Sequence, residues 1–150
     1  MADAGKTEQG NELQIRKLID DWAKALHAKD VDKIMSVYAS DVVAFDLAPP
    51  LKYAGADAHR KSFEQWFATF RGPIASEMRD LDITVGKDVA FSRCFNRIRG
   101  ARTNGEETDV WVRVTVCFHK RDDKWTVVHE HVSVPFYMDG SYRAAVDLEP

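Results

Sequence analysis

Hydrophobic residues follow a helical period in the first half of the chain and an alternating period in the second. The first stripe recurs every three or four residues and consists of Ile15, Leu18, Ile19, Trp22 and Leu26. This spacing predicts an amphipathic helix from Asn11 to about Ala28, with Asn11 and Gln14 as a capping pair. Asp30 is placed to cap a second, short helix over residues 31–38. Two helices are therefore expected to open the fold.

A short apolar run and an aromatic stripe come next. Val42 to Leu47 is rich in β-forming residues and stops before Pro49-Pro50, which cannot donate hydrogen bonds to a sheet, so we expect a short strand there. The aromatic stripe has the spacing i, i+3, i+4 and i+7, and it consists of Phe63, Trp66, Phe67 and Phe70. It predicts a third helix that begins near Ala56 and ends at Gly72-Pro73.

After Pro73 the period becomes that of β-strands for roughly sixty residues. Four long strands are expected over residues 74–85, 88–101, 107–120 and 124–134, joined by turns short enough for antiparallel hairpins. The sequence thus predicts one α+β domain spanning residues 1–150, in which three N-terminal helices pack on a long antiparallel sheet. Residues 1–10 are expected to be flexible. Residues 136–150 lack periodicity and are expected to lie across the surface or a partner subunit.

The turns predict which side chains face the helices. If Asn104-Gly105 is a two-residue turn, Thr103 pairs with Glu106, and Arg93 and Arg97 then share the inner face. Inner charges beneath only three helices favour a cavity, because burying an unpaired charge costs several kcal/mol (order of magnitude).

Lys124 to Pro135 contains an acid between two histidines. Because side chains alternate along a strand, Glu130 takes one face and His129 and His131 the other. A three-residue loop at residues 121–123 would set Glu130 opposite Val114, on the inner face. Two interpretations of Glu130 stay open, a cavity acid or half of a buried ion pair with an inner-face arginine.

Composition narrows the class of protein. The 150 residues carry a net charge of −3 with scattered Lys and Arg, which argues against a nucleic-acid or membrane surface. The N-terminus has no apolar block typical of a signal peptide, so we expect a cytoplasmic protein. Cys94 and Cys117 fall in strand-like runs without metal-ligand spacing, as expected of reduced thiols. No cofactor motif is present, and we expect no cofactor.

The order of elements resembles the nuclear transport factor 2-like superfamily, specifically its SnoaL-like members related to ketosteroid isomerase. Three segments carry the resemblance: Ala28–Asp41, Gly55–Arg60 and Lys124–Pro135. It covers about Glu12 to Pro135. It implies a cone-shaped fold with a pocket between helices and concave sheet, and a homodimer formed through the convex face.

The resemblance also implies residue roles. It places Asp46 on the general base of ketosteroid isomerase, while the oxyanion-hole tyrosine and aspartate of that enzyme fall at Trp22 and Val114. Because such donors typically contribute about 10²–10³ in rate, steroid isomerisation by the familiar mechanism is not expected. Arg93 falls on an arginine that lines the pocket of the kinase association domain of the same superfamily.

These observations support two functional hypotheses. In the first, a cavity binds a small, largely apolar molecule, with proton-transfer chemistry of an isomerase, cyclase or lyase and Asp46 as base. In the second, the chain is a non-catalytic ligand-binding or assembly module, and Asp46 only satisfies loop amides. The expected ligand-binding residues are Trp22, Tyr38, Tyr53, Phe63, Trp66, Phe67, Arg93, Val114 and Glu130. His59 is expected at an exposed or rim position.

The other face of the sheet predicts a partner. Trp111 and Arg113 share that face with His129 and His131, and a homodimer would cover them. An H-x-H pair on a strand is also typical of metal sites, but no third ligand is placed on this face, so no metal is expected.

Overall fold

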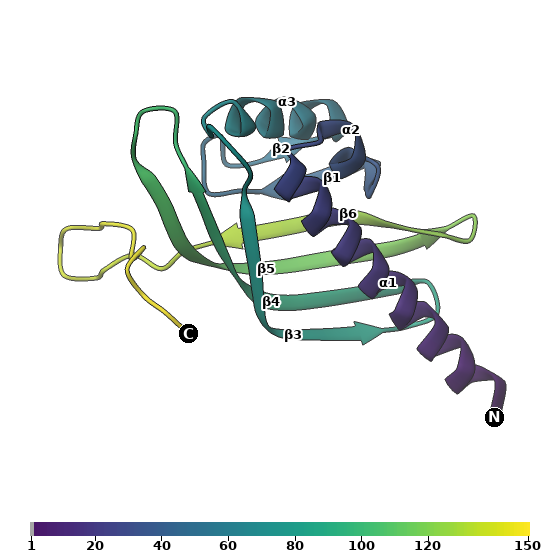
Figure 1. Cartoon of the computed structure of the whole chain (residues 1–150). Coiled ribbons are helices and arrows are strands. Elements are labelled where there is room, and N and C mark those ends of the chain that lie inside the picture. The colour runs from purple at the N-terminus through teal and green to yellow at the C-terminus, as the bar shows by residue number, and fades with distance from the viewer. Residues whose placement is uncertain (1) are drawn as a thin grey trace.

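Three helices lie on one side of a six-stranded sheet in the computed structural model, which describes residues 2–150 and the side chains from residue 7 onward (Figure 1). The helices are α1 (Ala2–Ala28), α2 (Val31–Met35) and α3 (Ala56–Phe67). The strands are β1 (Tyr38–Phe45), β2 (Tyr53–Ala54), β3 (Ala75–Val85), β4 (Val89–Ala101), β5 (Glu107–Arg121) and β6 (Lys124–Ser133). The predicted α+β class is confirmed.

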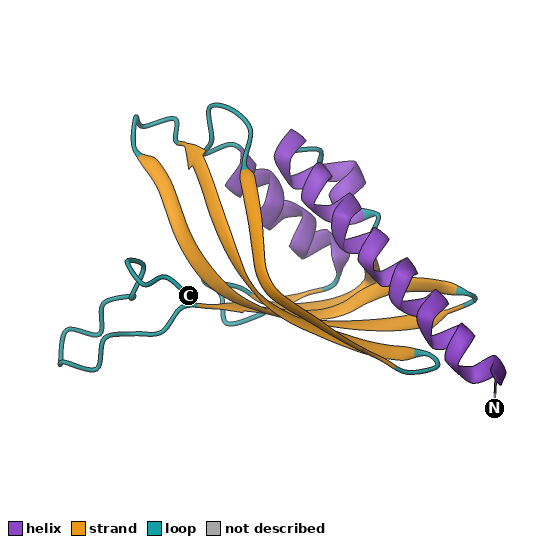
Figure 2. Cartoon of the chain, turned by 60° about the horizontal axis from the view of Figure 1, so that its bottom comes forward, coloured by secondary structure: helices purple, strands orange, loops and turns teal. Residues whose placement is uncertain are grey.

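The strand order is β2-β1-β6-β5-β4-β3. The last four strands form the predicted antiparallel meander. β1 lies parallel to β6 and begins at Tyr38, four residues before the predicted start, because its pairing with Val127 of β6 already begins there. β2 has only two residues, which the hydrophobic pattern does not predict as a strand, and it is held by antiparallel pairing with β1. Figure 2 shows the helices together on one side of the bent sheet.

Helix boundaries follow tertiary contacts more than local signals. The Asp30 carboxylate caps α2 as predicted, accepting from the Lys33 amide at 3.0 Å. α3 ends at Phe67 and not at Gly72, because Phe70 leaves the helix to form a β-bridge with Arg102. α1 includes residues 2–10, which were expected to be flexible. No helix in the described part of the chain is long and apolar enough to cross a membrane.

Asn11 ties α1 to the sheet and does not cap it. It lies inside the helix and is buried. Its amide nitrogen donates to the carbonyls of Gly86 and Lys87 at 3.4 Å, in the β3–β4 turn. Its amide oxygen accepts from Lys120 Nζ at 3.2 Å and from the Trp125 indole N–H at 3.4 Å. One amide therefore joins the helix to both ends of the meander.

The β4–β5 turn corrects the predicted register by one residue. Arg102 N donates to Glu106 O at 2.8 Å, so the loop has three residues and ends at Gly105, whose φ of 89° favours glycine. A one-residue change moves every side chain to the other face. Arg93 and Arg97 therefore lie on the outer face, opposite Thr115 and Trp111. The inner positions of β4 are Ser92, Cys94, Asn96 and Ile98.

The β5–β6 hairpin keeps Glu130 on the predicted face for a reason that the sequence conceals. Asp122 and Asp123, both with positive φ, form a two-residue turn in which Arg121 pairs with Lys124. Between Phe118 and Cys117 the pairing of β5 with β6 then shifts by one further residue of β6. The two one-residue differences sum to two, so Glu130 lies opposite Val116 and still faces inward.

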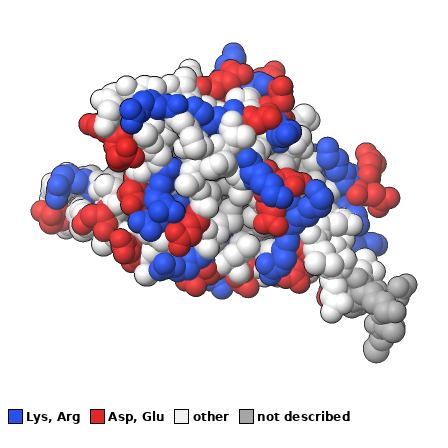
Figure 3. Space-filling view, in the orientation of Figure 1, with Lys and Arg blue, Asp and Glu red and all other residues white. Residues whose placement is uncertain are grey.

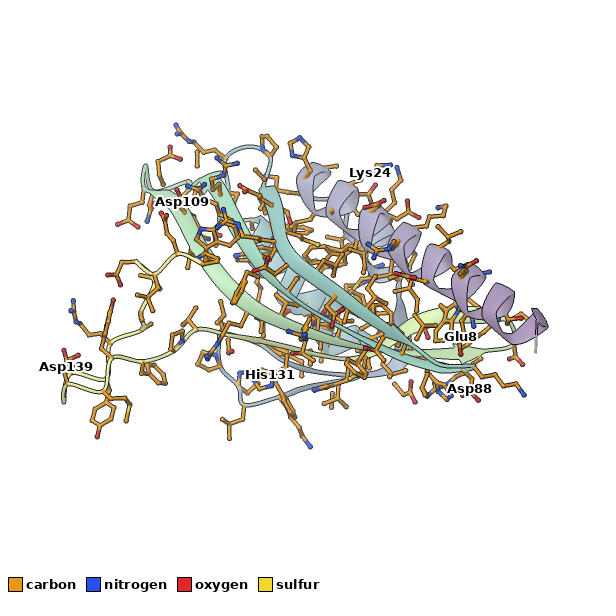
Figure 4. All side chains as sticks on the ribbon, turned by 90° about the horizontal axis from the view of Figure 1, so that it is seen from below. Glu8, Lys24, Asp88, Asp109, His131 and Asp139 are labelled. Atoms are coloured by element: carbon orange, nitrogen blue, oxygen red, sulfur yellow. The ribbon has the colours of Figure 1, made fainter. Side chains whose placement is uncertain are left out.

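The C-terminal segment extends the chain beyond the sheet. Asp139 lies in a loop that projects from the body of the molecule (Figure 4). Phe136 bridges to Ala144, and Tyr137 N donates to Arg143 O at 2.9 Å. Ala145 is buried. No helix or named strand includes this segment, and a role in a partner contact stays a prediction.

Gly100 is required where β4 passes the aromatic end of α3. A Cβ atom at this position would lie 2.8 Å from two ring carbons of Phe70 and 3.3 Å from the carbonyl oxygen of Pro73. A Cβ atom at Gly10, in α1, would meet no atom within 4 Å beyond its own stretch of helix. We expect Gly100→Ala to lower the free energy of unfolding by about 1–3 kcal/mol. Gly10→Ala should raise it by about 0.5–1 kcal/mol. Urea unfolding measures both, and equal effects would contradict the close packing at Gly100.

Candidate functional site

A cavity of about 420 Å³ lies between the helices and the inner face of the sheet. Its wall combines aromatic side chains of α3 with a row of valines from β5 and β6. Seven of the residues predicted from the sequence line it: Trp22, Asp46, Tyr53, Phe63, Trp66, Val114 and Glu130. An apolar wall with a few polar groups is typical of a small-molecule site.

A second, smaller space of about 50 Å³ lies beside this cavity, and we call it the inner chamber. Four residues line both spaces, and we call this group the waist: Trp22, Asn96, Val114 and Glu130. Tyr38, also predicted as a site residue, lines the inner chamber and not the larger cavity. The waist therefore brings together side chains from α1, β4, β5 and β6.

Two predicted site residues lie elsewhere. Phe67 is buried in the core and lines neither space. Arg93 lies on the outer face, with 70% of its side chain exposed, and pairs with Asp82 at 3.1 Å. The expected ion pair of Glu130 with an arginine is therefore wrong, since the other candidate, Arg97, binds Asp109 at 2.8 Å.

Glu130 is instead held by hydrogen bonds from aromatic side chains. Tyr38 OH donates to Glu130 Oε2 at 2.8 Å, and Trp22 Nε1 donates to Tyr38 OH at 2.9 Å. His59 Nε2 lies 2.8 Å from Glu130 Oε1. Glu130 is only 8% exposed, and the hydroxyl of Tyr38 is buried with it. Desolvation, reinforced by the Glu130 charge, raises the pKa of Tyr38 well above its ordinary value.

The direction of these bonds fixes the charge arrangement. An indole N–H can only donate a hydrogen bond. The Tyr38 oxygen therefore accepts from Trp22, and the Tyr38 O–H donates a hydrogen bond to Glu130. His59 Nδ1 is buried and has no hydrogen-bond partner among the described residues. An unpaired N–H at that buried atom would be costly, so the favoured tautomer carries its proton on Nε2 and donates to Glu130. Glu130 is then a carboxylate that accepts two hydrogen bonds.

His59 is the functional residue that the sequence prediction misplaced. It was expected at the rim, but it is fully buried. Its ring meets Tyr38 edge-on at 4.6 Å between centroids and packs 4.8 Å from Phe63. The signal was present in the sequence, because His59 lies four residues before Phe63 and eight before Phe67, on the same buried stripe of α3.

Asp46 follows directly after β1 at the edge of the larger cavity. By area it is exposed, because it borders the open cavity, yet nearby protein atoms still remove much of its hydration. Desolvation raises the pKa of Asp46, and the charge of Glu130 raises it further. The Leu47 amide donates to Asp46 Oδ1 at 2.7 Å, which opposes the shift. Asp46 Oδ2 has no hydrogen-bond partner within the described chain.

Arg102 is the cationic residue among those that line the cavity, and its guanidinium is hydrogen-bonded. Arg102 lines the outer end, where it donates to Thr108 Oγ1 at 2.6 Å and to Thr69 Oγ1, and its guanidinium lies 4.0 Å above the Phe70 ring. On the molecular face shown in Figure 3, basic and acidic side chains alternate without a large patch of one sign. The cavity is therefore a largely apolar space with Asp46 and Glu130 on its wall and Arg102, bound to neutral hydroxyls, at its outer end.

The outer face carries the residues expected at a dimer interface. Phe45 packs edge-on against both histidines, at 4.7 Å from His129 and 5.5 Å from His131. His131 lies on the side of the sheet opposite α1 (Figure 4). Trp111 lies beneath the guanidinium of Arg79 at 4.7 Å. Among the described side chains, from residue 7 onward, no cluster of three or more His, Cys, Asp or Glu groups is arranged to hold a metal ion.

The comparisons with known proteins agree with this architecture. The model of the SnoaL-like domain matches residues 15–137. The chain therefore belongs to the SnoaL-like domain family, within the nuclear transport factor 2-like superfamily. No match is found among curated proteins.

Solved structures place the fold among proteins of different roles. A nuclear transport factor 2-like protein of unknown function from Pseudomonas putida is 32% identical, with a TM-score of 0.86 over 95% of this chain and 98% of that one. A putative scytalone dehydratase from Novosphingobium aromaticivorans is 20% identical, with a TM-score of 0.79 over 97% and 95%. The association domain of CaMKII from C. elegans is 18% identical, with a TM-score of 0.65 over 84% and 97%. The fold thus occurs both in a protein described as a putative enzyme and in an assembly domain.

The Tyr38 hydroxyl is expected to stabilise the fold. Tyr38→Phe leaves the Trp22 N–H and one Glu130 oxygen without a partner, and we expect the free energy of unfolding to fall by about 2–4 kcal/mol. Tyr53→Phe is the matched control, since its hydroxyl makes one exposed hydrogen bond to Pro49 O. That change should cost less than about 0.5 kcal/mol. Equal losses in urea unfolding would contradict the network.

Proposed function

We propose that the larger cavity binds a small, largely apolar, uncharged molecule, and that Asp46 abstracts a proton from it. The observation that carries the proposal is the pair of carboxylates, Asp46 and Glu130, on the wall of an otherwise apolar cavity. A carboxyl of raised pKa that lies in a cleft beside a second carboxylate is typical of proton-transfer sites.

The hydrogen bonds divide the roles of the two acids. Both oxygens of Glu130 are occupied by Tyr38 and His59, which keep this carboxylate in place. Asp46 keeps one oxygen without a protein partner, and its pKa is raised by desolvation. A stronger base with a free lone pair is the better proton acceptor. Asp46 is therefore the base, and Glu130 is the positioned charge that strengthens it.

The chemistry can be written without a cofactor. A C–H bond next to a carbonyl or similar group breaks, its proton moves to an Asp46 oxygen, and its electron pair moves into the substrate as an enolate. Return of that proton to another carbon gives an isomerisation. Departure of the hydroxyl group on the adjacent carbon, which takes the proton held by Asp46 and leaves as water, gives an elimination. The putative dehydratase among the structural neighbours supports the second outcome as a reaction class.

A second candidate function is assembly. The outer face bears exposed Phe45, which packs against His131, and exposed Phe91, and the projecting C-terminal segment has exposed apolar side chains such as Phe136 and Met138. Large apolar side chains gathered on one surface favour a protein partner. We propose that a second copy of the chain covers this face, and the association domain among the neighbours supports such a role for the fold.

Asp46→Asn tests the chemistry. A neutral cyclic ketone such as 2-tetralone in D₂O, followed by proton NMR, reports exchange of its α-protons. We expect the wild type to accelerate exchange and the variant to lose about 10²-fold or more of that acceleration while binding is retained. The wild-type rate should rise with pH through the raised pKa of Asp46, above the ordinary value of about 3.9. Unchanged exchange in the variant would remove Asp46 as the base.

The same variant has a second readout in stability. A carboxyl whose pKa is raised on folding favours the native state when it is protonated, and it disfavours it once pH rises above the folded-state pKa. Asp46→Asn should therefore have a melting temperature equal to or above that of the wild type at pH 7, and the difference should vanish near pH 3. A large loss of stability at pH 7 would show a structural role.

Light scattering tests the assembly proposal. We expect a dimer at micromolar concentration, and His131→Glu should shift it toward monomer because it buries a charge in the proposed interface. Leu13→Glu is the control, since this residue is exposed on α1, away from the outer face. A monomeric wild type, or equal dissociation of both variants, would contradict an interface at this face.

A further inference from the structure

The inner chamber contains hydrogen-bonding groups that the protein itself does not use. Ser92 and Asn96 are each only 3% exposed, and both line the chamber from β4. The Ser76 hydroxyl donates to Asn96 Oδ1 at 2.7 Å, which orients the amide. Within the described chain, no group accepts from Asn96 Nδ2, and the Ser92 hydroxyl makes no hydrogen bond. Among the described side chains only His59 Nδ1 is both fully enclosed and without a partner, so the Asn96 and Ser92 groups stay open to the chamber, where a polar guest can satisfy them.

We propose that the inner chamber binds the polar end of the ligand. Asn96 Nδ2 donates to an uncharged oxygen of the guest, a carbonyl or a hydroxyl, and Ser92 Oγ supplies a second hydrogen bond deeper in the chamber. The apolar body of the guest then fills the larger cavity, on the other side of the waist. This inference rests on the proposed function only in taking the cavity as a ligand site, and it does not require Asp46 to act as a base.

Glu130 disfavours an anionic group in the inner chamber. It borders both spaces as a carboxylate with both oxygens hydrogen-bonded, so an anionic group beside it meets repulsion in a site of low polarity. The Arg102 guanidinium lines the larger cavity and not the chamber, so it does not offset that repulsion inside the chamber. An ammonium group carries no acceptor for Asn96 Nδ2 and would leave that donor unpaired. A neutral oxygen acceptor satisfies both constraints.

Cys94 contributes to this wall as an uncharged side chain. It lies between Ser92 and Asn96 and lines the same chamber. Burial raises the pKa of the Cys94 thiol to about 11, so the thiolate that a nucleophile requires is scarce at neutral pH. The chamber is large enough for a few water molecules, and water alone is the competing occupant.

The neutral aromatic ketone prodan tests the proposal, because its emission moves to shorter wavelength when its carbonyl loses a hydrogen bond. We expect bound prodan to show this shift in Asn96→Leu, together with a Kd about 3- to 10-fold weaker. Ser92→Ala is the milder variant, and its Kd should weaken by about 2- to 5-fold. Asn104→Leu, in the β4–β5 turn, is the matched control and should change neither quantity.

A pair of isosteric competitors tests the selection against charge. We expect 2-acetonaphthone to displace prodan at a concentration at least about tenfold lower than 2-naphthoate, which replaces the methyl ketone with a carboxylate. Unchanged emission and Kd in both β4 variants would show a chamber that holds only water and would overturn the proposal. So would equal affinity for the two competitors, or failure of prodan to bind the wild type. The proton-transfer proposal is tested by α-proton exchange and the chamber proposal by prodan binding to the β4 variants, so failure of one is recognised separately from failure of the other.

Discussion

The burial of Glu130 is the constraint on which the site depends. A carboxylate in an apolar wall is tolerated only if hydrogen bonds replace its lost hydration. Here Tyr38 in β1 and His59 in α3 supply the hydrogen bonds to Glu130, and Trp22 in α1 donates to the Tyr38 hydroxyl and orients it. The network therefore fixes how the helices meet the sheet, and one of its members, His59, is fully buried. Stability and site geometry depend on the same four side chains.

The sheet register gives this network its position. Parallel pairing of β1 with β6 sets Ala44 beside Glu130, and the same strand then delivers Asp46 to the cavity edge two residues later. The bulge in the β5–β6 pairing turns Glu130 inward after Trp125 and Val127 have also faced inward. Two acids thus reach one cavity from adjacent strands. The charge of Glu130 contributes to the raised pKa of Asp46. The position of Glu130 near Asp46 is therefore part of the proposed chemistry.

The two faces of the sheet carry separate properties. The inner face holds the cavity, the inner chamber and the unpaired donors of β4. The outer face holds Arg93 and Arg97, which pair with acids, and Arg79, which stacks on Trp111, so Arg102 at the cavity's outer end is the cation that lines the cavity among the described residues. This separation favours a neutral guest inside and a protein partner outside. The two candidate functions are therefore compatible, since they use opposite surfaces.

The sequence by itself determined the class and order of elements. Periodicity located the long strands to within one or two residues, the cap at Asp30 and the aromatic stripe of α3, because these are local signals. It also placed Glu130 inward and His129 and His131 outward. What only the tertiary structure decided was the register. Asn104-Gly105 fits a two-residue or a three-residue loop, and that single residue determines whether Arg93 or Asn96 faces the cavity. The partner of Glu130 followed from the same choice. Long-range pairing also set the ends of β1 and α3, since these depend on contacts with residues far away in the chain.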